Sequence, residues 1–220
     1  MCAENLEKMD DFFANRIDTY DTYILENVPG CQEGYRLMAQ ALPADAKTLL
    51  DLGCGTGLEL KEIFALHPDA QVTGIDLSSV MLQRLREKYP DRALTLIHGS
   101  YFEHSLGQDA FDAAVSFETM HHFTPEAKLG LYRRIHDALR PSGIYVECDY
   151  MVESDEEEAY FAAENRRIRL EQGIAPDAVY HYDTPLTVAH QVELLLSASF
   201  VTVRKVWREQ NTTLLIAKKP

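Results

Sequence analysis

A glycine-rich turn close to residue 50 constrains the fold of this chain more than any other feature of its sequence. The turn reads Asp51-Leu52-Gly53-Cys54-Gly55-Thr56-Gly57, and it lies between an apolar run at 48–52 and a helical pattern that ends before Pro68. Glycine lets the backbone turn tightly and approach a ligand without a Cβ in the way. A turn that joins a strand to a helix in this manner is where doubly wound α/β sheets bind their ligands. We therefore predict a ligand site on this turn.

Short apolar runs alternate with helical patterns from residue 48 onward, which is typical of a parallel sheet covered on both faces. Strands are predicted at 48–52, 71–75, 94–97, 111–117, 144–149, 200–207 and 212–217, and helices at about 57–66, 78–88, 125–139, 155–171 and 186–197. Too few residues separate the last two strands for a parallel crossover, so they should pair as an antiparallel hairpin at the sheet edge. The predicted fold class is α/β, with a Rossmann-like, seven-stranded, mostly parallel sheet, helices on both faces and a C-terminal antiparallel hairpin.

The spacing of the glycines argues against two common nucleotide sites. A dinucleotide-binding turn needs G-x-G-x-x-G, but the sixth place is Leu58 when counted from Gly53 and Leu60 when counted from Gly55. No Gly-Lys-Ser/Thr follows, so the turn is not a phosphate-binding P-loop either. The acid at its first position, Asp51, suits a cationic ligand and would repel a pyrophosphate.

The whole segment 51–57 resembles the first motif of class I S-adenosylmethionine-dependent methyltransferases, D-x-G-x-G-x-G. The resemblance implies S-adenosylmethionine as the cofactor and methyl transfer to a small-molecule acceptor by in-line displacement at the sulfonium. It also implies that the backbone of Gly53, Cys54, Gly55 and Gly57 lines the methionyl and ribose portions, and that Asp51 lies near the amino group. A non-catalytic protein that binds the same cofactor for regulation is the rival hypothesis, since a fold does not fix a function.

Further cofactor contacts are expected at the ends of the next strands. Asp76 ends the second strand about twenty residues after the turn, where an acid can accept both ribose hydroxyls. Leu77 and Met81 would flank the adenine, although apolar residues there are equally expected in the core. After the third strand, Ser100 stands where the family usually has an acid or small polar residue, and Tyr101 could stack on the base.

The fourth strand ends in Phe117-Glu118-Thr119-Met120-His121-His122-Phe123, which should face the transferred methyl group. We predict that Phe117 contacts the cofactor and that His121, His122 and, on the fifth strand, Glu147 are the catalytic candidates, with either histidine able to act as a general base. No metal site is predicted, because adjacent residues point in different directions and no H-E-x-x-H spacing brings two imidazoles onto one face.

The segments outside the sheet suggest a lid. Residues 1–45 are predicted to form N-terminal lid helices, in which Tyr20 contacts the cofactor, and residues 46–220 to form the methyltransferase domain with a cap segment at about 153–185. A weaker resemblance over most of the chain is to the carboxy-S-adenosylmethionine synthases. Those enzymes bind the extra carboxylate with a cation before the last helix, whereas residues 173–185 contain no Arg or Lys. Carboxylation of the cofactor is therefore kept as a minor alternative.

The composition limits partners and location. A formal net charge of −14 disfavours nucleic acid and anionic membranes as partners. The four cysteines show no C-x-x-C spacing or framework pattern, and neither a signal peptide nor a long apolar stretch is recognisable. We therefore expect a cytoplasmic protein that acts on a small molecule, and the sequence leaves a homodimer open.

Overall fold

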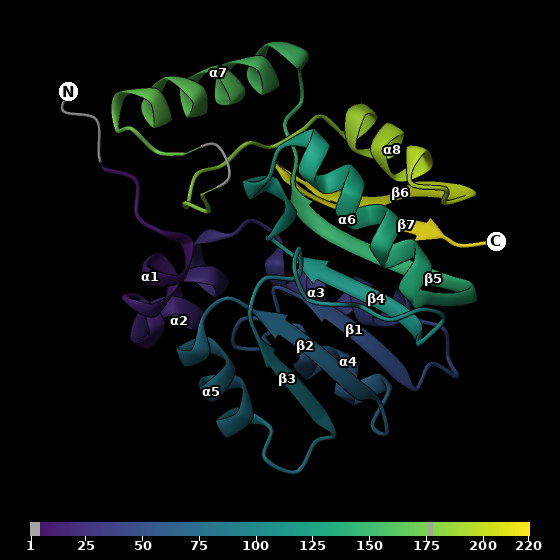
Figure 1. Cartoon of the computed structure of the whole chain (residues 1–220). Coiled ribbons are helices and arrows are strands. Elements are labelled where there is room, and N and C mark those ends of the chain that lie inside the picture. The colour runs from purple at the N-terminus through teal and green to yellow at the C-terminus, as the bar shows by residue number, and fades with distance from the viewer. Residues whose placement is uncertain (1–4, 176–177) are drawn as a thin grey trace.

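A seven-stranded sheet with the order β3-β2-β1-β4-β5-β7-β6 forms the centre of the computed structural model, which describes residues 5–175 and 178–220 (Figure 1). The strands β1 to β5 pair in parallel, and β7 pairs antiparallel with both β5 and β6. Their bounds are β1 Thr48–Leu52, β2 Gln71–Asp76, β3 Leu94–His98, β4 Phe111–Phe117, β5 Leu139–Tyr150, β6 Thr202–Glu209 and β7 Thr212–Lys218. The predicted fold class is confirmed, including the hairpin at the edge.

Helices cover both faces of this sheet. One face packs on α3 (Cys31–Ala41), α4 (Leu60–Leu66) and α5 (Ser79–Lys88), and the other on α6 (Pro125–Ala138) and α8 (Val188–Ser197). The side chains of β1 alternate accordingly: Leu49 belongs to the first core and Leu50 to the second, as the two-residue period of a strand requires. This alternation also decides which way each polar residue of the central strands points.

Three further helices lie away from the two cores. The helices α1 (Met9–Ala14) and α2 (Ile17–Asn27) lie beyond the carboxyl ends of the parallel strands, and α7 (Asp155–Glu171) runs along the outside of the molecule (Figure 1). In α7 the Ser154 hydroxyl accepts a hydrogen bond from the Glu157 backbone N–H, and all four residues of the first turn are acidic. A serine cap and acids at the positive end of the helix dipole explain why the helix begins there.

Two element boundaries differ from the prediction by three residues or more. The helix expected from residue 57 begins at Leu60, because Gly57 keeps a left-handed φ of 70° and the turn continues past it. The fifth strand begins at Leu139 rather than residue 144 and passes through Pro141, with an irregular register between Phe111 and Ala113 on β4. Proline is compatible with a strand at such an irregularity, so Pro141 did not end the element.

No helix in the described part of the chain combines the length and the apolar character needed to cross a bilayer.

Candidate active site

Two neighbouring cavities open where the parallel strands end. The smaller holds about 50 Å³ and the larger about 600 Å³. The smaller is lined by Met9, Phe13, Tyr20, Gly53, Gly55, Asp76, Leu77, Met81, Tyr101, Phe117, Glu118, Thr119, His122 and Phe123. Four side chains, those of Phe13, Tyr20, Glu118 and His122, line both cavities and therefore form the boundary between them.

The glycine turn and the end of β2 build the floor of the smaller cavity. The Asp76 carboxylate accepts hydrogen bonds from the backbone N–H of Gly55 at 2.9 Å and of Ser78 at 2.8 Å, so both of its oxygens are fixed. Gly53 has a φ of 70°, and a Cβ there would lie 2.6 Å from the Thr119 hydroxyl oxygen. Only glycine fits this position, which holds the turn against the loop after β4.

Asp51 lies beneath the turn rather than in the cavity wall. It is on the same face of β1 as Leu49, and it is buried beside Glu59. Burial, reinforced by the neighbouring Glu59, raises the pKa of Asp51 well above its usual range, and burial raises the pKa of Glu59 to about 7. Within the described residues, Oδ2 of Asp51 and Oε1 of Glu59 have no hydrogen-bond partner. Two buried acids with spare acceptor atoms suit a cationic group.

Eight of the twelve residues that the sequence suggested for cofactor contact line the smaller cavity, namely Tyr20, Gly53, Gly55, Asp76, Leu77, Met81, Tyr101 and Phe117. The other four do not line it. Asp51 is buried beneath the turn, Cys54 packs under Gly74, Gly57 packs against Leu85, and Ser100 accepts a hydrogen bond from the Phe102 N–H in its own loop.

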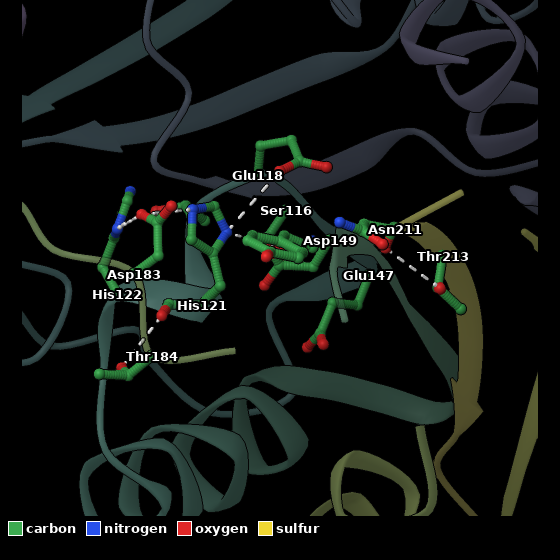
Figure 2. Close-up of polar contacts among 12 residues, drawn as sticks. Ser116, Glu118, His121, His122, Glu147, Asp149, Asp183, Thr184, Asn211 and Thr213 are labelled. Atoms are coloured by element: carbon green, nitrogen blue, oxygen red, sulfur yellow. Dashed lines mark hydrogen bonds and ion pairs between the residues drawn. The ribbon is translucent and has the colours of Figure 1, made fainter. Parts of the chain in front are cut away.

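His121 and His122 form a cluster with two carboxylates in the wall of the larger cavity (Figure 2). His121 Nδ1 lies 2.5 Å from Oδ1 of Asp149, and its Nε2 lies 3.6 Å from Oδ1 of Asp183. His122 Nδ1 lies 3.3 Å from the same Asp183 oxygen, and the two imidazole centroids are 4.0 Å apart. Both backbone N–H and hydroxyl of Thr184 donate to the His121 carbonyl, at 2.6 Å and 3.1 Å, which ties the cap segment to this turn.

The expectation that the adjacent histidines point apart is wrong. It assumed the alternation of a strand, but Met120–His122 is a single 3-10 turn after β4. Both imidazoles therefore lie on one side of the chain and meet Asp183, which comes from the loop before α8.

The electrostatics of the cluster are set by burial and by the acids. Burial opposes a charge on both imidazoles, but the adjacent Asp149 carboxylate raises the pKa of His121 to about 9. The pKa of His122 is lowered, because burial and the neighbouring His121 outweigh its 3.3 Å contact with Asp183. Burial also raises the pKa of Glu118 to about 8, although the nearby His121 opposes this shift. The pKa of Asp183 is lowered instead. Burial raises it, but the contacts with His122 and His121 outweigh burial and hold it well below its usual range.

Glu147 does not belong to this site, which corrects its place among the catalytic candidates. It is fully buried on the β5 face that packs on α6 and α8, and it lines neither cavity. Its carboxylate accepts hydrogen bonds from Tyr132 at 2.8 Å, Tyr145 at 2.9 Å and Gln191 at 2.5 Å. Figure 2 draws no polar contact between Glu147 and either histidine.

The sequence did not single out several residues that the fold brings to the cavities. Met9, Phe13, Thr119 and Phe123 line the smaller cavity, and Arg16 and Asp183 line the larger. Asp183 stands in an irregular loop, and only the neighbouring His181 hinted at a polar site there. Glu118 was within the quoted motif, but its left-handed φ of 48° could not be anticipated.

Comparison with known proteins agrees with this arrangement. Residues 49–143 match a methyltransferase domain family. The chain also resembles an O-methyltransferase family protein from Burkholderia thailandensis, with a TM-score of 0.70, 15% identity and coverage of 96% of this chain and 63% of that one. Residues 49–143 therefore match a methyltransferase domain, and the chain as a whole has the fold of the class I S-adenosylmethionine-dependent methyltransferases.

Two other relatives refine the comparison. Human N-acetylserotonin methyltransferase, solved in complex with S-adenosylmethionine, matches with a TM-score of 0.62 and 17% identity over 84% of this chain and 51% of that one. The carboxy-S-adenosyl-L-methionine synthase of Campylobacter lari is 25% identical, covering 97% of this chain and 96% of the relative. The chain spans less than two thirds of these two solved methyltransferases, which share its fold. The methyltransferase match and the neighbour solved with S-adenosylmethionine support this cofactor and a methyltransferase or related enzyme.

Proposed function

We propose that this protein transfers the methyl group of S-adenosylmethionine to a small molecule bound in the larger cavity. The observation that carries the proposal is the shared boundary of the two cavities at Phe13, Tyr20, Glu118 and His122. A cofactor on the glycine turn and an acceptor in the larger cavity would meet at this boundary. When bound, the cofactor supplies an already activated methyl group, so the protein contributes mainly alignment and exclusion of water.

The residues of the smaller cavity fit the cofactor in chemistry. Asp76 presents a fixed carboxylate for the ribose hydroxyls, and the unpartnered oxygens of Asp51 and Glu59 lie beneath the turn to balance the amino group. The space does not suffice in this closed form, since ligand pockets usually hold about 300–1,000 Å³. Met9 and Phe13 of α1 line the smaller cavity on the side of the N-terminal helices. We therefore propose that residues 1–45 act as a lid whose first helix withdraws on cofactor binding; residues 1–4 lie outside the described residues.

The cap at 153–185 completes the proposed acceptor site. His181 and Asp183 from this segment line the larger cavity together with Phe12 and Tyr150, while residues 176–177 of the predicted cap lie outside the described residues. We expect His121 or His122 to act as a general base toward the acceptor, because these side chains lie at the boundary of the two cavities or beside it.

Formation of carboxy-S-adenosylmethionine is the second candidate, because the Campylobacter lari relative matches along nearly its whole length. The chemistry of the larger cavity argues against it. Its lining includes Asp183, whose ionised carboxylate would repel an added carboxylate. Its arginine, Arg16, is already paired with Glu7 through two hydrogen bonds of 3.2 Å and 2.7 Å. Methyl transfer to a neutral or cationic acceptor suits this lining better.

Incubation with methyl-labelled S-adenosylmethionine and a fractionated metabolite extract, followed by mass spectrometry, tests the proposal. We expect label in a small organic product, and much less of it with Asp76→Ala. Carboxylated cofactor without a methylated product would favour the second candidate. Cofactor binding with neither product would favour a regulatory binding protein.

A further inference from the structure

The cluster of His121, His122 and Asp183 has the composition and spacing of a metal site. Its three ligand atoms all lie within 4.8 Å of one another. Bonds of about 2.0–2.2 Å in a tetrahedron place neighbouring ligand atoms about 3.3–3.6 Å apart. The Asp183 oxygen lies 3.3 Å from His122 Nδ1 and 3.6 Å from His121 Nε2, so two of the three separations already match.

The Nδ1 atom of His122 is buried without a well-formed hydrogen bond to the described residues. Its side chain is 5% exposed, yet its Nδ1 makes no hydrogen bond to any described residue, although Asp183 is close. A buried imidazole nitrogen that has a charge contact but no well-formed hydrogen bond can still accept a ligand such as a metal ion. The atom faces the same carboxylate oxygen as His121 Nε2, which is the place an ion would occupy.

The environment of His121 is also typical of a metal-binding histidine. Asp149 holds Nδ1 at 2.5 Å, which fixes the ring and directs Nε2 toward Asp183. Metal-binding histidines characteristically have a carboxylate on their other nitrogen, which orients the ring and strengthens it as a ligand. A second possible ligand group, Glu118 with His121 and Asp149, would need this same Nδ1, so the group with Asp183 is favoured.

The carboxyl groups around the cluster also offer oxygen ligands to a cation. Three carboxyl groups, from Glu118, Asp149 and Asp183, lie within 4 Å of His121. Among the described residues that line the larger cavity, Arg16 is the one arginine or lysine, and Glu7 already neutralises it.

We infer that His121 Nε2, His122 Nδ1 and Asp183 bind a divalent transition-metal ion of the Zn²⁺ type in the wall of the larger cavity. Two histidines and one carboxylate leave an open coordination position, as in catalytic zinc and non-haem iron sites. This position would receive an oxygen or nitrogen of the acceptor and hold it at the boundary of the two cavities. The site itself stands independently, but this role for the ion rests on the proposed methyl transfer.

The metal alone tests the site, because neither cofactor nor acceptor is needed. Full-length protein is stripped with a chelator and titrated with Co²⁺, followed by its visible absorption, and then with competing Zn²⁺. Elemental analysis gives the stoichiometry. Asp183→Asn keeps the size of the side chain and removes its charge. His190→Ala is the matched control, since His190 belongs to a surface group with Asp155 and Glu158 that could also hold an ion.

We expect one ion per wild-type chain, affinity at least about tenfold weaker in Asp183→Asn, and wild-type affinity in His190→Ala. Unchanged binding of S-adenosylhomocysteine by Asp183→Asn would show that the variant is folded. If Asp183→Asn does not bind S-adenosylhomocysteine, the His122→Ala variant is compared with the wild type instead. Binding of less than one ion, equal affinity in wild type and the cluster variant, or loss of the ion in His190→Ala would overturn the inference. A bound ion without methyl transfer would contradict the proposed function alone.

Discussion

The peptide between His121 and His122 decides whether two neighbouring imidazoles can act on one target. In an extended strand they would lie on opposite faces. The 3-10 turn at Met120–His122 instead places their centroids 4.0 Å apart. No local signal in the sequence predicts this turn, and none predicts that Asp183 returns to it from a distant loop. The glycine turn, by contrast, was predictable because its conformation depends on its own residues.

At the same scale, Asp76 should dominate the polar recognition of the cofactor. Asp76→Ala removes a charged acceptor that is held by the N–H groups of Gly55 and Ser78. We expect a loss of about 1–3 kcal/mol in the binding of S-adenosylhomocysteine, or roughly 5- to 150-fold in Kd, measured by calorimetry. The exposed Asp91→Ala serves as the control. Equal affinities of all three proteins would refute the ribose assignment.

Glu147 should affect stability and leave binding unchanged. Burial raises the pKa of its carboxyl from 4.5 to about 7, so the folded state holds a proton that the unfolded state releases between these values. The stability of the wild type relative to Glu147→Gln should therefore fall as the pH rises from 4.5 through 7, by up to about 3 kcal/mol. Urea unfolding at pH 5 and pH 8 measures this difference. A difference that does not change with pH would contradict the assignment.

Among the elements, the strands and most helices were predictable because their periodicities differ. Apolar runs and caps located all seven strands and the helices α4 to α8. The misplaced start of β5 shows the limit: Pro141 signals a break locally, but pairing of Leu139 with Phe111 on β4 starts the strand before it. Tertiary pairing overrides local propensity at such positions.

The first helix, α1, should control entry of the cofactor. It is held to the cap by a hydrogen bond of 3.3 Å from the Met9 N–H to the Val179 carbonyl and by stacking of Phe12 on His181, with centroids 3.5 Å apart. Such a ring contact contributes about 0.5–1.5 kcal/mol. Removing it in His181→Ala should favour the open lid and raise the association rate constant of S-adenosylhomocysteine about 2- to 12-fold.

Stopped-flow fluorescence measures this rate, and His104→Ala, an exposed histidine far along the chain from the lid, is the control. An unchanged or slower association in His181→Ala would mean that α1 does not limit entry.

For the whole molecule, ligand binding should appear as thermal stability, because the proposed cofactor site is built by residues from several strands and from the N-terminal helices. At a ligand concentration of 100 times Kd, S-adenosylhomocysteine should stabilise the folded state by about 2.7 kcal/mol. For a chain of this size that corresponds to roughly 5–11 °C in Tm by differential scanning fluorimetry. NADH at the same concentration should give no shift. A shift with NADH alone would contradict the cofactor assignment.

The hydrogen bonds from Thr184 to the His121 carbonyl have a mechanical consequence for the molecule. Because these bonds join the loop before α8 to the turn that carries His121, a movement of that loop should also move the His121 imidazole. A molecule too large for the larger cavity would displace this loop and, with it, His121. A molecule that fits would leave the loop and the imidazole in place. The size of the bound molecule would thus determine whether His121 stays in the position that the reaction needs.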